Sequence, residues 1–326
     1  MRSVVNVPPR DVIVIGASAG GVKALSELVS GLPAGFPASL FIVLHVSPSH
    51  KSYLPDILGK RGPLPAVHPS SRDPIEPGKI YIAPPDLHLL LQDGHVELWR
   101  GPKENGHRPA INALFRSAAV SYGPRVAAIV LSGGLDDGSS GLWWVKRYGG
   151  VAIVQDPHTA EQPEMPHNAL QYADVDYVLE LPDIAPLLVK LAAQKSQPPA
   201  AATADDMPLK PSQDASLQKG HPLEATCPDC GGPLSEVQDG RLHQFRCLVG
   251  HTYSPRSLLE AHSSAEERAL WNAVVKLEEA AEMVRHLSAD VPPELAARLQ
   301  RQTEVKKEQA ATVRRVLEKL EPYQLE

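Results

Sequence analysis

Residues 11–21 have the sequence DVIVIGASAGG, which predicts a buried strand that turns sharply into a helix. Val12–Ile15 is an apolar, β-branched run, and the residues from Val22 onward repeat with helical spacing. Between them, Gly-x-Ser-x-Gly allows a tight bend and leaves Ser18 at the carboxyl end of the strand, in the form of a nucleophile elbow. A phosphate-binding turn is the alternative, but the spacing is not Gly-x-Gly-x-x-Gly and the second strand ends in His45 rather than an acidic residue. We favour the elbow.

Composition narrows the class of protein. A chain of 326 residues suggests two domains, and a net charge of −6 supplies no basic field for nucleic acid or an acidic membrane. No apolar run approaches the ~18 residues that span a bilayer, and the amino end lacks the apolar segment of a signal peptide. Three cysteines are not a disulfide framework. We therefore expect a cytoplasmic protein without membrane insertion or a nucleic-acid partner.

Strand-like and helical segments alternate in the first part of the chain. Five apolar runs predict strands: DVIVIG, SLFIVLH, RVAAIVLSG, GVAIVQD and DYVLEL. Helical spacing occurs between several of them, at Val22–Val29, Ile111–Tyr122, Ser139–Tyr148 and Met165–Tyr172. Within residues 79–100, alternating strands flank Asp93-Gly94, a hairpin signal. We predict an α/β fold with a doubly wound, mostly parallel sheet and a small antiparallel hairpin.

Composition and periodicity divide the whole chain into four segments. We assign residues 1–195 to the α/β domain, 196–221 to a flexible linker rich in Pro, Ala, Ser and Gln, 222–254 to a compact cysteine unit, and 255–326 to an α-helical hairpin. Ser254-Pro255 is typical of a helix start, and Ser264–Glu267 has the form of a capping box. The apolar seams comprise Leu270, Val274, Leu277, Ala281 and Val284, then Leu295, Leu299, Val313, Val316 and Leu320. A hairpin closing on itself is favoured over self-association as a coiled coil.

An activated serine needs a base and an orienting acid, and parallel strands end at one edge of a sheet. His45 ends the second strand, and Asp137 follows the run RVAAIVLSGG by a short turn, so both are expected near Ser18. His45 would take the serine proton, Asp137 would orient the imidazole, and N–H groups at the elbow and at Gly133-Gly134 would hold the oxyanion. The open alternatives are Asp136 as the acid and His158 or His167 as the base.

Five ordered motifs, IGASAGG, IVLHV, HRPAINALFRSAA, LSGGLDDGSSG and QDPHTAEQPEMP, closely resemble the catalytic domain of the chemotaxis protein-glutamate methylesterases, the CheB family. The resemblance implies a hydrolase in signal transduction that removes methyl groups from glutamyl esters of chemoreceptors, and in some members deamidates receptor glutamines. Matched motif to motif, it places the nucleophile on Ser18, the base on His45 and the acid on Asp137, not Asp136. It further implies oxyanion donors at Ala19 and Gly134, with Met165 shaping the cleft.

The resemblance has two departures. The family's turn before the acid commonly has the sequence Gly-Met-Gly-Asn-Asp-Gly, whereas residues 133–138 are GGLDDG. Family members often carry an amino-terminal receiver domain, and only about ten residues precede the first strand here, so we expect no such switch. Within the motif HRPAINALFRSAA, Arg108 is a candidate contact for a carboxylate-rich receptor surface, and a solvated helix start is the equal alternative.

All three cysteines lie in one window, as Cys227-x-x-Cys230 and Cys247-x-x-x-His251. Two such pairs about fifteen residues apart are typical of a zinc site in which each pair lies in its own turn and supplies two ligands to one ion. A Cys3His ligand set is typical of structural zinc sites. His243 is a competing ligand, and buried thiols in a small core are the alternative. Few basic residues surround the unit, which argues against nucleic-acid binding.

Two functions from different classes remain in competition, and hydrolysis of some small ester is a third option. The first is a serine esterase that acts on methylated glutamates of a chemoreceptor-like partner, with no cofactor for catalysis and a structural zinc in the carboxyl-terminal unit. The second is a catalytically idle signalling scaffold that binds a partner through the zinc ribbon and helices. The intact Ser18, His45 and Asp137 set favours the first.

Overall fold

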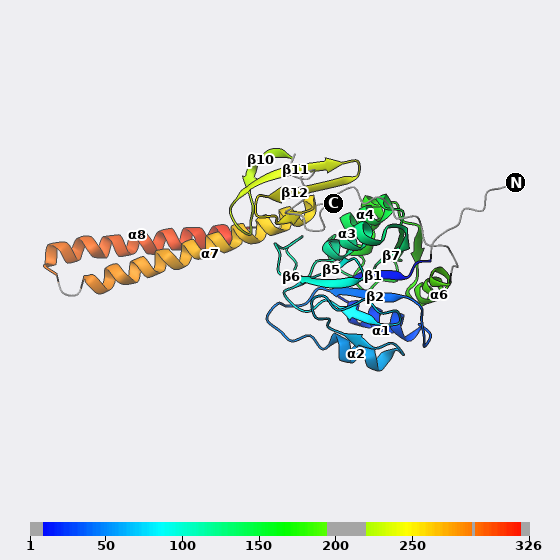
Figure 1. Ribbon diagram of the computed structural model, residues 1–326. Coiled ribbons are helices and arrows are strands. Elements are labelled where there is room, and N and C mark those ends of the chain that lie inside the picture. The colour runs from blue at the N-terminus through cyan, green and yellow to red at the C-terminus, as the bar shows by residue number, and fades with distance from the viewer. Residues whose placement is uncertain (1–8, 194–219, 289–290, 321–326) are drawn as a thin grey trace. The chain divides into compact units, whose positions relative to one another are not determined.

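The computed structural model describes residues 9–193, 220–288 and 291–320. Two compact units divide the chain, Met1–Ser257 and Leu258–Glu326. The first unit contains the α/β domain and the cysteine unit, and the second contains most of the carboxyl-terminal helices (Figure 1). Most of the expected linker, residues 196–219, lies outside the described residues. No described helix has the length and apolar character needed to cross a membrane.

A seven-stranded sheet forms the centre of the α/β domain. Its strand order is β3-β4-β2-β1-β7-β8-β9, and every neighbouring pair is parallel. The strands are β1 (Val12–Ala17), β2 (Ser39–Leu44), β3 (Ala66–Val67), β4 (Ile80–Ile82), β7 (Val126–Val130), β8 (Val151–Gln155) and β9 (Tyr177–Leu179). From β1 the chain builds one half of the sheet through β2 and the other through β7. The carboxyl ends of β1 and β7 therefore flank the topological switch point, where open α/β sheets place their sites.

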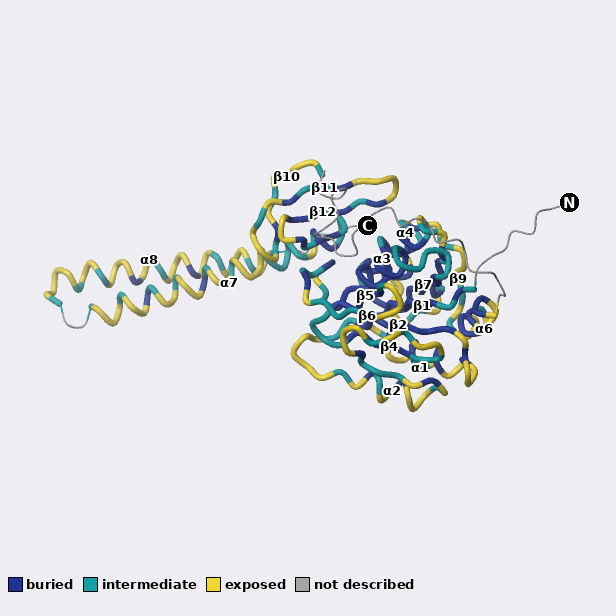
Figure 2. The backbone as a smooth tube through the Cα atoms, in the orientation of Figure 1, coloured by how far each residue is buried: buried dark blue, intermediate teal, exposed yellow. Residues whose placement is uncertain are grey.

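Helices cover both faces of the sheet (Figure 1). One face packs against α1 (Gly21–Ser30), α2 (Leu54–Arg61) and α6 (Leu181–Ala192). The other packs against α3 (Ile111–Tyr122), α4 (Ser139–Arg147), α5 (Glu164–Tyr172) and the hairpin of β5 (His88–Gln92) and β6 (His95–Trp99). Ile13 belongs to the first core and Val14 to the second, so β1 is buried on both sides (Figure 2). Apolar runs without polar alternation fit such a strand.

The predicted α/β architecture is confirmed, with local differences. The expected helix at Ile111–Tyr122 has those bounds, and Asp93-Gly94 forms the hairpin turn with both residues at positive φ, 41° and 85°. Ile80–Ile82, which lies in the same alternating segment as the hairpin, instead joins the main sheet beside β2. The sequence pattern also missed α2 and α6, which carry prolines near their amino ends. A short 3-10 turn, Gly123–Arg125, precedes β7.

The cysteine unit is a four-stranded antiparallel sheet of β10 (His221–Thr226), β11 (Pro233–Asp239), β12 (Leu242–Cys247) and β13 (Thr252–Tyr253). It belongs to the same compact unit as the α/β domain. Exposed ion pairs join the two parts, with Arg147 bound to Asp239 at 2.8 Å and Arg241 bound to Asp174 at 2.7 Å. Such pairs are worth little each, and the buried contacts near β13 described below bind the parts more tightly.

Two long helices follow, α7 (Pro255–Leu287) and α8 (Pro293–Leu317). Ser254 caps α7, since its hydroxyl accepts the Ser257 N–H at 3.0 Å, whereas Ser264–Glu267 lies inside α7 and starts no helix. Within the second unit the helices form a hairpin, in which Arg314 of α8 binds Glu278 of α7 at 2.6 Å. The seam expected on α8 is wrong in part, because Leu295 and Val316 are 42% and 50% exposed while Thr303 and Ala310 are buried.

Candidate active site

Ser18 lies in a tight turn between β1 and α1, as expected for an elbow. Its N–H donates to Ser132 O at 2.9 Å, and its carbonyl accepts the Gly21 N–H at 2.8 Å. Gly20 has φ 76°, and a methyl group there would lie 2.6 Å from Ser132 Oγ. Only glycine fits that conformation and that space. The turn leaves Ser18 half-buried at the carboxyl end of β1.

His45 and Asp137 meet at the same edge of the sheet. His45 follows β2, where its N–H donates to Ala17 O at 3.2 Å. Its Nε2 lies 2.8 Å from Asp137 Oδ2, and the two side chains are only 7% and 1% exposed. Asp136, the competing acid, makes no contact with His45 among the described residues. The structure therefore pairs His45 with Asp137.

Asp137 is held as a carboxylate by donors from several directions. The Ile111 and Asn112 N–H groups at the start of α3 donate to it at 2.7 and 3.2 Å, and the Gly138 N–H donates at 3.1 Å. Burial by itself raises the pKa of Asp137, but the hydrogen bond and charge of His45, with the Ile111 N–H, outweigh it and hold that pKa below its usual value. In the tautomer with its proton on Nε2, His45 donates a hydrogen bond to the ionised Asp137, and Nδ1 can accept a proton.

His45 Nδ1 is buried and has no hydrogen-bond partner among the described residues. A methyl group on Gly133 would lie 2.9 Å from Ser18 Cβ, which places Ser18 against the turn that leads to Asp137. The structure thus brings serine, imidazole and carboxylate to one rim and shows the hydrogen bond between His45 and Asp137. The hydrogen bond from Ser18 to His45 stays a prediction, and such bonds often tighten only with substrate bound.

The sequence patterns did not identify His107 as a site residue. Its ring stacks on that of His45, with centroids 3.7 Å apart and planes 12° from parallel. Burial and the nearby charge of His45 lower the pKa of His107 to about 4, so the ring is neutral near pH 7. A neutral ring covers the imidazole of His45 without repelling its protonated form. The signal that could have identified His107 is its position as the first residue of the motif HRPAINALFRSAA, next to Arg108.

The residues expected around the oxyanion lie beside Ser18. A methyl group on Gly133 would lie 2.7 Å from Met165 Sδ, so the buried Met165 packs beneath the Gly133–Gly138 turn. The Leu135 N–H donates to Glu164 at 2.9 Å, whereas the N–H groups of Ala19 and Gly134 donate no hydrogen bond within the described parts of the chain. Those two N–H groups therefore remain available, and their role stays a prediction.

The remaining candidates lie farther from this chemistry. Arg108 donates to Asp86 Oδ1 at 2.9 Å and to Gly101 O at 2.7 Å, so a substrate carboxylate would compete with these partners. His158 and His167, the reserve bases, are exposed. Neither contacts Asp137 among the described residues. His45 is the histidine that the fold pairs with the acid.

Asp136 is itself buried and lines a separate pocket with Ser139, Tyr172 and Ser254. Neither of its carboxylate oxygens accepts a well-aligned hydrogen bond within the described residues. Burial raises the pKa of Asp136 to about 6, although the nearby Ser254 hydroxyl and the charge of Arg256 favour the ionised form. The charged carboxylate therefore destabilises the fold near neutral pH.

We expect Asp136→Asn to stabilise the protein by about 2 to 4 kcal/mol at pH 7.5 and by well under ~1 kcal/mol at pH 4. The folded-state pKa of Asp136 is raised from its ordinary value of 3.8 to about 6, so the unfolded chain loses its proton first as the pH rises. Wild-type stability thus falls between about pH 4 and pH 6, and the asparagine variant lacks this loss. Denaturant titrations of both proteins at the two pH values measure the difference. Equal differences at both pH values would contradict the prediction.

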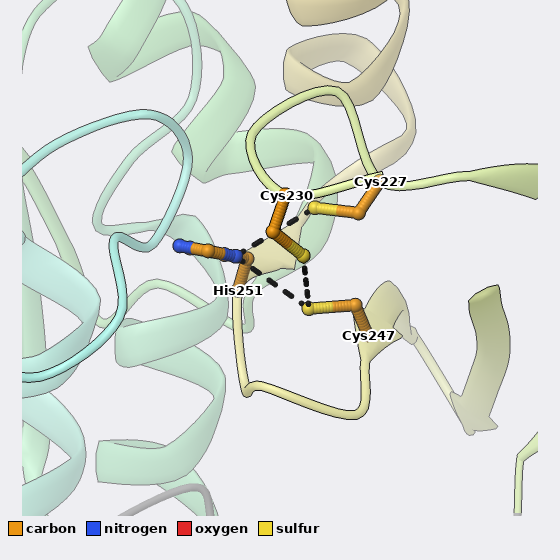
Figure 3. A group of neighbouring side chains, drawn as sticks. All are labelled: Cys227, Cys230, Cys247 and His251. Atoms are coloured by element: carbon orange, nitrogen blue, oxygen red, sulfur yellow. Dashed lines mark hydrogen bonds between the residues drawn. The ribbon is translucent and has the colours of Figure 1, made fainter. Parts of the chain in front are cut away.

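Cys227, Cys230, Cys247 and His251 form a Cys3His cluster able to hold a metal ion, with all ligand atoms within 4.8 Å of one another (Figure 3). Cys230 Sγ lies 3.7 Å from Cys247 Sγ, and His251 Nδ1 lies 3.7 Å from Cys227 Sγ and 3.5 Å from Cys247 Sγ. Tetrahedral zinc with bonds of about 2.3 Å to sulfur and about 2.0 Å to nitrogen separates its ligand atoms by roughly 3.5 to 3.8 Å. The observed spacings fit that geometry.

Glycine turns shape both ligand pairs. Gly231 has φ 71° and donates to Cys227 O at 2.8 Å, and Gly250 has φ 105° and donates to Cys247 O at 3.0 Å. His243, the competing ligand, lies outside the cluster with its Nε2 2.7 Å from Glu236 Oε1. The cluster is therefore built from the two spaced pairs.

Comparisons with known proteins locate the similarity in the α/β domain. The family model of CheB methylesterase matches residues 13–188. A protein of Leptospira interrogans is 37% identical over 182 residues, 56% of this chain and 94% of that protein. Protein-glutamate methylesterase/protein-glutamine glutaminase 2 of Methanosarcina mazei is 37% identical over 190 residues, 56% of this chain and 52% of that protein. The crystal structure of the Thermotoga maritima CheB methylesterase catalytic domain matches with a TM-score of 0.53 and 34% identity, over 56% of this chain and 98% of that one.

Proposed function

Because this chain belongs to the CheB methylesterase family, we propose that it is a serine esterase that hydrolyses glutamate methyl esters on chemoreceptor-like proteins. The observation that carries the proposal is the contact of His45 with Asp137 at the strand edge that also presents Ser18. The family model covers more than half of the chain, and the named relatives supply the substrate class. We place the protein in the cytoplasm, where its thiols stay reduced.

The proposed mechanism uses His45 Nδ1, the nitrogen that does not face Asp137. Ser18 Oγ gives its proton to Nδ1 and attacks the ester carbonyl, while the N–H groups of Ala19 and Gly134 hold the oxyanion. The imidazolium, stabilised by Asp137, then protonates the leaving methanol. Water attacks the acyl-enzyme by the same route and releases the glutamate. A glutamine amide would follow these steps with ammonia as the leaving group.

Methanol release from a methylated chemoreceptor cytoplasmic fragment tests the function. The full-length chain is mixed with receptor carrying glutamate methyl esters, and methanol is measured over time. A second sample with receptor glutamines is followed by mass spectrometry for deamidation. Release of methanol supports the esterase. A folded protein that releases none from any receptor tested would instead favour a signalling scaffold that acts through its zinc-ribbon unit and helices.

We further propose that the Cys3His cluster holds a structural zinc ion. Four protein ligands close a tetrahedral site, and such sites serve folding rather than catalysis. The sheet of β10–β13 is small, with few buried apolar side chains in this part of the chain. A metal supplies the stability that so small a core lacks.

We expect the purified protein to contain about one zinc per chain, since the four ligands form one closed site. Cys227→Ser removes a ligand and should lower the zinc content severalfold under mild chelation. His243→Gln is the matched control, because His243 binds Glu236 and not the cluster, and it should keep wild-type zinc. Elemental analysis after dialysis against a chelator measures all three proteins. Equal zinc in the wild type and in Cys227→Ser would refute the assignment.

A further inference from the structure

A closed turn, residues 103–107, carries His107 to the ring of His45. The Glu104 N–H donates to His107 O at 3.2 Å, and the His107 N–H donates to Glu104 O at 2.9 Å. Asn105 and Gly106 cross the turn with φ 50° and 77°. Because the turn is closed on itself, a displacement of Asn105 moves His107. The stacking of His107 on His45 therefore depends on what holds the turn in place.

The outer side of this turn is hydrogen-bonded to the ribbon, which is the four-stranded cysteine unit of residues 220–254, and to the first turn of α7. The Asn105 N–H donates to Thr252 O at 2.7 Å, and the Thr252 N–H donates to Lys103 O at 3.3 Å. Asn105 Oδ1 accepts the Ser254 N–H at 2.9 Å and the Ser257 hydroxyl at 2.8 Å. Asn105 is 6% exposed, so these bonds lie away from water. Without the Oδ1 acceptor, the Ser254 N–H and the Ser257 hydroxyl keep only the hydrogen bonds between Ser254 and Ser257, and the described bonds from the Asn105 side chain to the first turn of α7 are lost.

The inner side of the turn is tied to the helix that binds Asp137. Glu104 is 1% exposed and accepts from Arg116 of α3 at 2.7 and 3.0 Å. The first N–H groups of α3, at Ile111 and Asn112, donate to Asp137. The turn is thus held between α3 and the ribbon. It contacts His45 directly through the ring of His107, and it is joined to Asp137 only through α3.

Thr252 follows the metal ligand His251 directly. The ligand loop from Cys247 to His251 is closed by the Cys247 N–H, which donates to His251 O at 3.1 Å. Gly250 in this loop approaches the α/β domain so closely that a methyl group on it would lie 3.2 Å from Pro102 Cγ. The metal-binding loop and the His107 turn are therefore neighbours in one buried contact. The hydrogen bond between Asn105 and Thr252 therefore joins the position of the turn to that of the metal-binding loop.

We propose that the ribbon is an intramolecular positioning element for the esterase, in which Asn105 couples the metal-bound loop to His107 and so to His45. The inference rests on the proposed esterase function and the proposed metal. Asn105 is a positioning residue and touches no substrate. Loss of the metal or of Asn105 Oδ1 frees the turn, the ring of His107 leaves that of His45, and proton transfer slows. Substrate binding, which does not use the turn, is unaffected.

Asn105→Gly tests the coupling, because glycine accepts φ 50° and the substitution removes the side chain with its Oδ1 acceptor while keeping the backbone N–H that donates to Thr252 O. We expect kcat for methanol release to fall about tenfold with KM within about twofold, since misplacing a reacting group by about 1 Å costs up to ~10²-fold. Asp239→Asn is the matched control, because it breaks the exposed contact with Arg147 at another part of the same interface. It should keep wild-type kcat.

A second readout does not depend on activity. The imidazole NMR signals of His107, identified with His107→Gln, report ring stacking in the full-length chain. We expect the same shift of these signals in Asn105→Gly and in chelated wild-type protein, with recovery in the wild type when Zn²⁺ is restored. Unchanged signals in both samples would overturn the coupling, as would a wild-type kcat in Asn105→Gly. If wild-type protein releases no methanol, the esterase proposal fails while the NMR shifts still decide the coupling.

Discussion

Replacement of Ser18 by alanine is expected to lower the rate of methanol release by about 10⁴- to 10⁶-fold. The substitution removes the oxygen that attacks the ester, so no acyl-enzyme forms. The residual rate of ester hydrolysis then comes from the oxyanion donors and from substrate binding. Ser18 Oγ makes no hydrogen bond among the described residues, so its loss should leave the stability and receptor affinity of the protein unchanged.

The measurement pairs methanol release with receptor binding by calorimetry. Ser26→Ala, in the helix that follows the elbow, is the control, because the one hydrogen bond of the Ser26 hydroxyl to a described residue goes to Val22 O at 2.7 Å. It should retain wild-type release. A Ser18→Ala protein with more than about one tenth of wild-type activity would mean that another group is the nucleophile.

Replacement of Asp137 by asparagine is expected to lower kcat by about 10³- to 10⁴-fold with a smaller change in KM. The carboxylate accepts hydrogen bonds from His45 Nε2 and from three backbone N–H groups. An amide at this position presents an N–H₂ group to one of these donors. Turned toward His45, it stabilises the tautomer with the proton on Nδ1, which cannot take the proton of Ser18.

Asp136→Asn is the matched control for this substitution, one residue away in the chain. Because Asp136 lies in its own pocket, we expect that variant to keep wild-type kcat while gaining stability at pH 7.5. Initial rates and denaturant titrations of both variants separate the two effects. Loss of activity in Asp136→Asn, with activity kept in Asp137→Asn, would reverse the assignment of the acid.

The sequence by itself determined the features that depend on neighbours along the chain. The β-branched apolar run at Val12–Ile15 favours a strand buried on both faces, and the glycines around Ser18 allow the sharp turn into α1. Two short spacings, Cys227 to Cys230 and Cys247 to His251, likewise place the ligands of each pair together in a single turn. Local sterics and periodicity act over a few residues, so the sequence pattern contains them.

Only the tertiary structure decided which distant residues meet. Asp136 and Asp137 are adjacent and chemically alike, and the packing of several distant segments, α3 among them, directs one to His45 and the other into a separate pocket. The stacking of His107 on His45 and the contact of Asn105 with Thr252 were likewise not predicted. Periodicity tells which face of a segment is buried, but the partner on that face depends on how separate segments pack.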